Sequence, residues 1–189
     1  MQNPRKKKKI IPIIIAIIVV CAAAFAGWYV YTHKTAGDKA DAVVKDLESL
    51  IPGLGAEEGY SSGAGRDPMG SLIVRGVDIV GCLEIPSIDL RAPVTVKGGT
   101  EQGFAAWLGG SPVKGHFSII GGMDDVFRNL AKAKPGDRVI FTDIDGVRYE
   151  YQVTTQYHLK KWDKGDNDLM LCFNSDSQTR FVLGCTKTL

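Results

Sequence analysis

The stretch KPGDRVIFTDIDGVRYEYQV, residues 134–153, decides the fold class of this chain. Two runs rich in β-branched and aromatic side chains, Arg138–Thr142 and Val147–Thr155, are typical of strands. Asp143-Ile144-Asp145-Gly146 separates them, and an Asp-Gly pair in so short a loop favours a hairpin turn. The stretch therefore predicts an antiparallel β-hairpin, which follows the turn signal Pro135-Gly136.

Runs of the same character lie on both sides of this hairpin, between Gly, Pro and Asp turn signals. They predict strands at Ile79–Ile85, Ala92–Val96, Phe117–Ile120, Leu169–Phe173 and Arg180–Leu183. Phe127–Ala133 has the spacing of a short amphipathic helix. Many short strands with one or two short helices indicate a mainly β domain, a closed or half-closed barrel, over residues 72–189.

The N-terminus has a different character. Basic residues fill Arg5–Lys9, and no charged side chain follows from Ile10 to Tyr31. A helix needs about 20 apolar residues to cross a bilayer, and Lys and Arg before a span favour the cytoplasmic side. The sequence predicts a cytoplasmic basic segment at 1–9, a single-pass membrane anchor at 10–32 and a domain outside the cell. The alternative is a signal peptide cleaved near Ala24-Phe25-Ala26.

Residues 33–71 connect this anchor to the β domain. The polar segment His33–Ala42 is interpreted as a juxtamembrane tether, and Ala42–Leu54 has helical apolar spacing that ends at Pro52-Gly53. Gly55–Gly70 is rich in Gly and Ser and is predicted to be a flexible linker.

Charge and cysteine content exclude some classes of function. The net charge is +2, and the basic excess lies in the first ten residues, so no nucleic-acid partner is expected. No Cys or His spacing typical of zinc occurs, and no metal or cofactor is expected. Outside the span, Cys82 and Cys185 lie in the first and last predicted strands, where they form either an interstrand disulfide or two separate thiols.

Several segments, taken in order, resemble the sortase family. They are VGCLEIPSIDL at 80–90, FRNL at 127–130 with KPGDRVIF at 134–141, GVRYEYQV at 146–153, and a C-terminal pair with Cys172 and Arg180. The resemblance covers Gly76 to Leu189. It implies a sortase-like closed β-barrel.

The resemblance also implies a reaction, cysteine transpeptidation at the surface of a Gram-positive cell. A thiolate attacks the Thr–Gly bond of an LPXTG-like sorting signal on a secreted protein, and a peptidoglycan-precursor or pilin amine resolves the thioacyl enzyme. The residues implied for this chemistry are Cys172 as nucleophile, His116 for proton transfer and Arg180 for the oxyanion.

Two alignments with the family remain open at the cysteine. Asp168–Cys172 fits the family's T-L-x-T-C with Cys172 as nucleophile, whereas a second register places Asn174 there. The first register retains the chemistry and the second abolishes it.

The histidine has the same ambiguity. The number of residues between His116 and Phe127 is close to that between the histidine and this phenylalanine in class A sortases, which favours His116. The strand pattern GHFSIIGG, however, places Gly122 where the family has histidine. His158 is a substitute candidate in the loop region before the Cys172 strand. The alternative function is therefore a catalytically degenerate sortase fold that binds sorting-signal peptides or an assembly partner.

Overall fold

The computed structural model describes residues 7–51, 53–54, 65–99, 102–122, 126–160, 165–175 and 179–188. The chain divides into two compact units, residues 1–36 and 37–189. Most of the predicted linker Gly55–Gly70 lies outside the described residues.

One helix, α1, runs without a break from Lys7 to Leu50. Its segment Ile14–Tyr31 is long and apolar enough to cross a membrane, and none of that segment is buried. The polar segment His33–Ala42, interpreted as a tether, is helical. Its Lys, Ala, Thr and Asp residues tolerate a helix, and a single Gly37 costs only about 1 kcal/mol. The helix ends just before Pro52, which cannot continue it.

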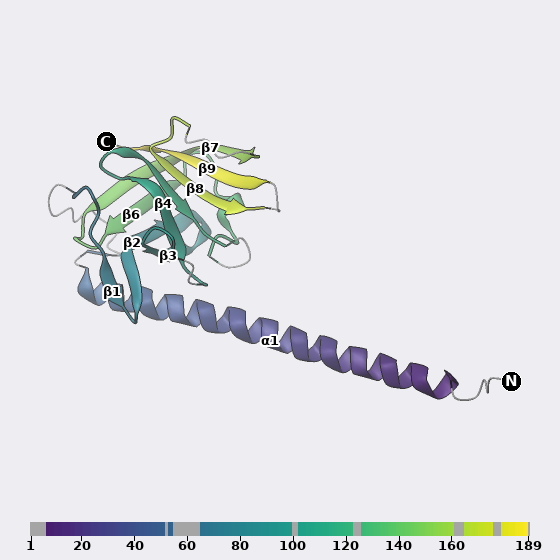
Figure 1. Cartoon of the computed structure of the whole chain (residues 1–189). Helices are drawn as coiled ribbons and strands as arrows, with labels where there is room; N and C mark the ends of the chain where they lie inside the picture. The colour runs from purple at the N-terminus through teal and green to yellow at the C-terminus, as the bar shows by residue number, and fades with distance from the viewer. Residues whose placement is uncertain are drawn as a thin grey trace. The chain divides into compact units, whose positions relative to one another are not determined.

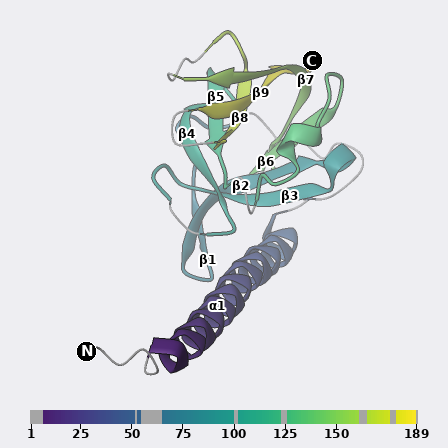
Figure 2. The same cartoon turned by 90° about the vertical axis from the view of Figure 1, so that its right-hand side faces the viewer.

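The described strands close into a barrel (Figures 1 and 2). The sheet order is β1-β2-β3-β4-β5-β8-β9-β7-β6, and a further antiparallel pairing of β2 with β6 closes the ring. The predicted mainly β barrel is thus confirmed. The strands are β1 Leu72–Val74, β2 Val77–Ile85, β3 Leu90–Thr95, β4 Ala105–Ser111, β5 Gly115–Ile120, β6 Arg138–Asp143, β7 Arg148–Leu159, β8 Leu169–Asn174 and β9 Arg180–Lys187.

The predicted hairpin is strands β6 and β7. At its turn the Gly146 N–H donates to the Asp143 carbonyl at 3.1 Å, and Gly146 has a φ of 80°. The Asp143 carboxylate also accepts from the backbone N–H groups of Asp145 and Val147 at 3.0 and 2.9 Å. The Asp residue therefore holds the loop through its side chain as well as its backbone.

Two short 3₁₀ helices complete the fold, η1 at Pro86–Ile88 and η2 at Leu130–Lys132. The amphipathic helix predicted at Phe127–Ala133 is reduced to η2 and the turn before it. Its apolar residues Phe127 and Leu130 are nevertheless fully buried in the barrel core.

Strands β1 and β4 were not predicted. β4 contains Gly109-Gly110 and two register irregularities against β5, so it lacks the regular alternation by which strands are recognised. β4 also pairs in parallel with β3 over only two residue pairs.

A second apolar cluster joins the end of α1 to the barrel within the unit 37–189. Val43, Leu47 and Ile51 pack there with residues of β1 and β2. Two ion pairs reinforce the contact: Arg75 with Asp46 at 2.6 Å, and Arg91 with Glu48. The C-terminal end of the helix, residues 37–50, is therefore part of the folded domain.

Cys82 lies in this helix-side cluster, whereas Cys185 lies in the barrel core. Both are free thiols, and their strands β2 and β9 are not neighbours in the sheet. Of the two alternatives for this pair, the structure has the separate thiols.

Candidate active site

Strand β8 has two faces, and the candidate site is built on the outer one. Leu169, Leu171 and Phe173 point into the barrel core. Met170 and Cys172 form an outer-face cluster with Val182 of β9. The partly buried side chains that pack on this cluster come from three other strands and are Leu108, Ile120, Tyr157 and Leu159.

Cys172 is completely buried in this cluster. Burial raises the pKa of its thiol from 9.0 to about 12, and the charge of Arg180 offsets only part of that rise. A thiol with this pKa is almost entirely protonated at neutral pH.

Arg180 begins β9 and lies opposite Asn174, not opposite Cys172. The β8–β9 register pairs Asn174 with Arg180 and Cys172 with Val182. The Arg180 Nε–H donates to Asn174 Oδ1 at 3.1 Å. Cys172 is thus a diagonal neighbour of Arg180 on the same face, at a typical Cα separation of about 7–8 Å.

His116 lies at the beginning of β5, in the left-handed region with a φ of 51°. Ile120, four residues further along, is the β5 partner of Cys172 in a parallel register. At about 3.3 Å per residue, His116 is displaced from the level of Cys172 by about 13 Å along the strand. The structure therefore does not bring His116 and Cys172 together.

His158 is exposed on β7 and pairs in register with Phe181. Its ring packs edge-on against Phe181, with ring centroids 5.4 Å apart. Phe181 belongs to the core-facing set of β9 residues, whereas Val182, the partner of Cys172, belongs to the outer set. His158 therefore lies on the opposite face of the sheet from Cys172.

Gly122, the other candidate for the histidine position, lies two residues beyond the end of β5. The N–H of Gly121 donates to the carbonyl of Cys172 at 3.0 Å, in line with the last pair of the β5–β8 register, Ile120 with Cys172. Because β5 and β8 are parallel, Gly122 follows β5 at the same end of the pair at which Asn174 ends β8. Asn174 in turn pairs with Arg180.

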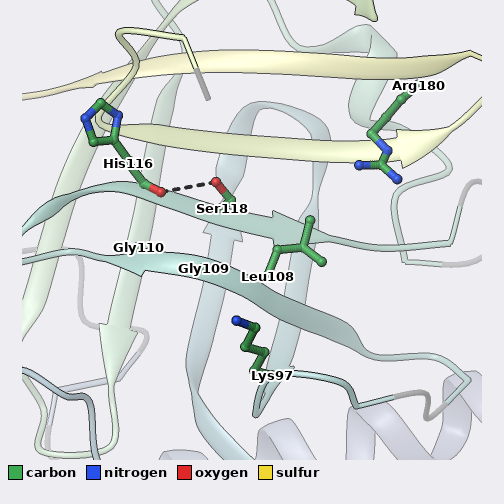
Figure 3. Close-up of a pocket in the computed structure, with 7 residues that line it drawn as sticks. All are labelled: Lys97, Leu108, Gly109, Gly110, His116, Ser118 and Arg180. Atoms are coloured by element: carbon green, nitrogen blue, oxygen red, sulfur yellow. Dashed lines mark hydrogen bonds between the residues drawn. The ribbon is translucent and has the colours of Figure 1, made fainter. Parts of the chain in front are cut away.

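A pocket of about 440 Å³ opens on this outer face (Figure 3). Arg180 and His116 lie toward opposite ends of it, with Ser118 and Leu108 between them. The described residues that line it are Lys97, Leu108, Gly109, Gly110, His116, Ser118 and Arg180. Its volume is within the range of about 300–1,000 Å³ found for ligand pockets.

Sequence reasoning missed four features of this pocket: Lys97, Leu108, Ser118 and the Gly109-Gly110 wall. The Gly-Gly pair in the middle of an apolar run was the available signal, since paired glycines often mark a bulge. Within the described part of the chain, no group of His, Cys, Asp and Glu is arranged to hold a metal.

Comparisons with known proteins agree with this fold. The model of the Sortase domain family matches residues 83–183, more than half of the chain. No curated protein sequence matches.

Among solved structures, sortase A of Listeria monocytogenes is similar at 22% identity and a TM-score of 0.51, over 59% of this chain and 88% of that one. Sortase C1 of Streptococcus agalactiae is similar at 17% identity and a TM-score of 0.53, over 79% and 89%. Sortase C-3 of Streptococcus pneumoniae has 18% identity and a TM-score of 0.53, over 82% and 81%. At these sequence identities, the solved structures show only that the fold is similar. Because the family model matches more than half of the chain, the chain belongs to the sortase family.

Proposed function

We propose that this domain is a catalytically degenerate sortase fold that binds sorting-signal-type peptides without cleaving them. One observation carries the proposal: Arg180 pairs with Asn174 and not with Cys172, and Gly122 follows β5 at the same end of the β5–β8 pair. The second register puts Asn174 at the nucleophile position, the strand pattern puts Gly122 at the histidine position, and Arg180 is the arginine. Two of the three lack the chemistry that the family's cysteine transpeptidation needs.

The state of Cys172 supports the same conclusion. With a pKa of about 12, its thiolate fraction at pH 7 is on the order of 10⁻⁵. Of the histidines whose side chains are described, His116 is displaced by about 13 Å along the strand and His158 lies on the other face. Neither is within proton-transfer distance of the buried thiol.

The capacity to bind a peptide is retained. Arg180 stays beside a pocket large enough for a few residues of an extended chain. Arg180 and Lys97 supply N–H donors, and Leu108 supplies an apolar contact, which is the mixture that peptide grooves use.

The second candidate is an active transpeptidase with Cys172, His116 and Arg180. It is favoured by the diagonal placement of Arg180 next to Cys172, whose pKa the guanidinium lowers against the effect of burial. In this reading Cys172 attacks an LPXTG-like signal, and a peptidoglycan-precursor or pilin amine takes the acyl group. Residues that cover Cys172 would have to move first.

For the placement of the domain, we propose a cytoplasmic segment 1–9, a single-pass anchor 10–32, a connecting region 33–71 and a sortase domain 72–189 outside a Gram-positive cell. The apolar helical segment Ile14–Tyr31 and family membership support membrane anchoring. The basic residues before the span support a cytoplasmic N-terminus.

One experiment separates the two functions. The full chain in detergent micelles is incubated with an LPXTG-type peptide and an amine, and intact mass is compared between the natural chain and Cys172→Ala. The proposal predicts peptide binding by fluorescence anisotropy in both proteins and no thioacyl adduct in either. An adduct that disappears in Cys172→Ala establishes the transpeptidase instead.

A further inference from the structure

We propose that the pocket selects peptides that carry a carboxylate side chain. This inference rests on the proposed peptide-binding function and specifies its ligand. Arg180 and Lys97 are the charged side chains among the described lining residues, and both are basic.

The charges around the pocket favour an anion. No acidic residue is among the described residues that line it. Asp168 comes just before Leu169, the β8 partner of Phe117, so its backbone lies beside that of His116. Its carboxylate already accepts from the Lys187 backbone N–H at 2.8 Å. Basic groups around a partly enclosed site attract a negatively charged ligand.

One wall of the pocket is bare backbone. Gly109 lies between the two register irregularities of β4, and Gly110 lies within the second. A Cβ added at Gly109 would meet no atom within 4 Å, so the glycine leaves open space on the pocket side. The Gly110 carbonyl accepts from Trp107 Nε1 at 3.0 Å, which fixes the wall in place. Such a wall admits the close approach of another backbone.

The two features together define the ligand. An extended peptide fits against the glycine wall and Leu108, and its acidic side chain lies beside Lys97, between the two ends of the pocket. A carboxylate there accepts a charge-assisted hydrogen bond from Lys97, and the charge of Arg180 at one end also attracts it. The backbone wall accounts for peptide binding in general, and the basic groups account for the choice of an acidic side chain.

The test uses two fluorescent peptides, LPETG and LPQTG, which differ only by a carboxylate and an amide. Binding to the full chain in micelles is measured by anisotropy at low salt. We expect LPETG to bind about fivefold more tightly, since a partly exposed charge contact contributes modestly. Lys97→Glu should abolish or reverse this preference, whereas Lys132→Glu, at an exposed position in η2, should leave it unchanged.

Gly109→Leu places a side chain into the pocket and so tests whether the peptide binds there. We expect it to weaken both peptides at least tenfold. Equal binding of LPETG and LPQTG overturns the acidic selectivity and leaves the proposed function standing. Binding of neither peptide overturns both. Binding unaffected by Gly109→Leu and Lys97→Glu places the ligand elsewhere and overturns the inference.

Discussion

Arg180 donates through Nε to the side-chain oxygen of Asn174 at 3.1 Å across the β8–β9 pair. The arginine of this barrel therefore faces an amide, and Cys172 lies one diagonal step away beneath an apolar cover. An amide oxygen accepts a hydrogen bond but is not a thiol nucleophile. Under the proposed function, Arg180 is kept for binding, and the side chain directly opposite it is not a thiol.

The double substitution Gly122→His/Asn174→Cys should create a thioacyl-forming site. Both positions are exposed; Asn174 is the register partner of Arg180, and Gly122 follows β5 at the same end of the β5–β8 pair. A cysteine at 174 escapes the burial that raises the Cys172 pKa, and the nearby guanidinium favours its thiolate. Incubation with an LPXTG-type peptide should give at least tenfold more adduct than the natural chain, measured by intact mass spectrometry.

Two controls accompany this variant. Asn174→Cys alone should form less adduct because it lacks the imidazole, and adding Arg180→Gln to the double variant should reduce adduct further. If the natural chain already forms as much adduct as the double variant, Asn174 is not the nucleophile position.

Alkylation of Cys172 should be slow in the folded chain because burial both covers the thiol and raises its pKa to about 12. Only the thiolate reacts with iodoacetamide, so at pH 7 we expect Cys172 to react at least tenfold more slowly in the native chain than in the urea-denatured chain. Peptide mapping by mass spectrometry separates Cys172 from the other cysteines. Equal or faster reaction in the native chain would instead show an activated thiolate, as an active transpeptidase requires.

Stability should fall at alkaline pH because burial raises the pKa of Cys82, Cys172 and Cys185 to about 12 each. Below pH 9 these thiols are neutral in both states. Above pH 9 they ionise in the unfolded chain and remain protonated in the folded one, so the free energy of unfolding decreases as pH rises. Each thiol contributes roughly 1 kcal/mol per pH unit between pH 9.5 and pH 11.

Cys172→Ala removes one of these contributions. Urea denaturation of the full chain in micelles should therefore show a shallower alkaline decrease for Cys172→Ala than for the natural chain. Parallel pH profiles for the two proteins would contradict the buried, neutral state of this thiol.

The C-terminal end of α1, which packs on the barrel, should contribute substantially to the stability of the domain. Leu47 is fully buried in the helix-side cluster, whereas Leu50 is 56% exposed. Leu47→Ala should lower the free energy of unfolding by about 2–4 kcal/mol, since it leaves a cavity. Leu50→Ala, a matched change on the same helix, should cost less than about 0.5 kcal/mol. Equal effects would show that the helix end does not pack on the barrel.

Residues with strong local patterns were predicted well. The β6–β7 hairpin follows from Asp143 and Gly146, because their turn chemistry is local. Strands β2, β8 and β9 have continuous apolar runs and were found within a few residues of their ends. The N-terminal apolar helix and the helical spacing of Ala42–Leu54 were equally apparent. The segment His33–Ala42 between them was interpreted as a tether because polar helix formers carry no periodic signal, yet it is helical.

The candidate site was harder to predict because it depends on register. Sequence spacing allowed either Cys172 or Asn174 beside Arg180, and either His116 or Gly122 near them. A shift of two residues keeps a side chain on the same face, so the alternation of apolar residues does not distinguish these alternatives. Lys97 and the Gly109-Gly110 wall come from loops and bulges, which have no periodic pattern.

The parallel pairing of β5 with β8 has a consequence for folding. The two strands are separated along the chain by the entire β6–β7 hairpin, and no local contact brings them together. Pairings between distant segments carry the largest loop-closure cost and form slowly. The pocket has lining residues on both sides of this closure, whereas the Asn174–Arg180 pair belongs to the local β8–β9 hairpin. We therefore expect the hairpin to form early and the complete pocket to be among the last parts of the domain to assemble.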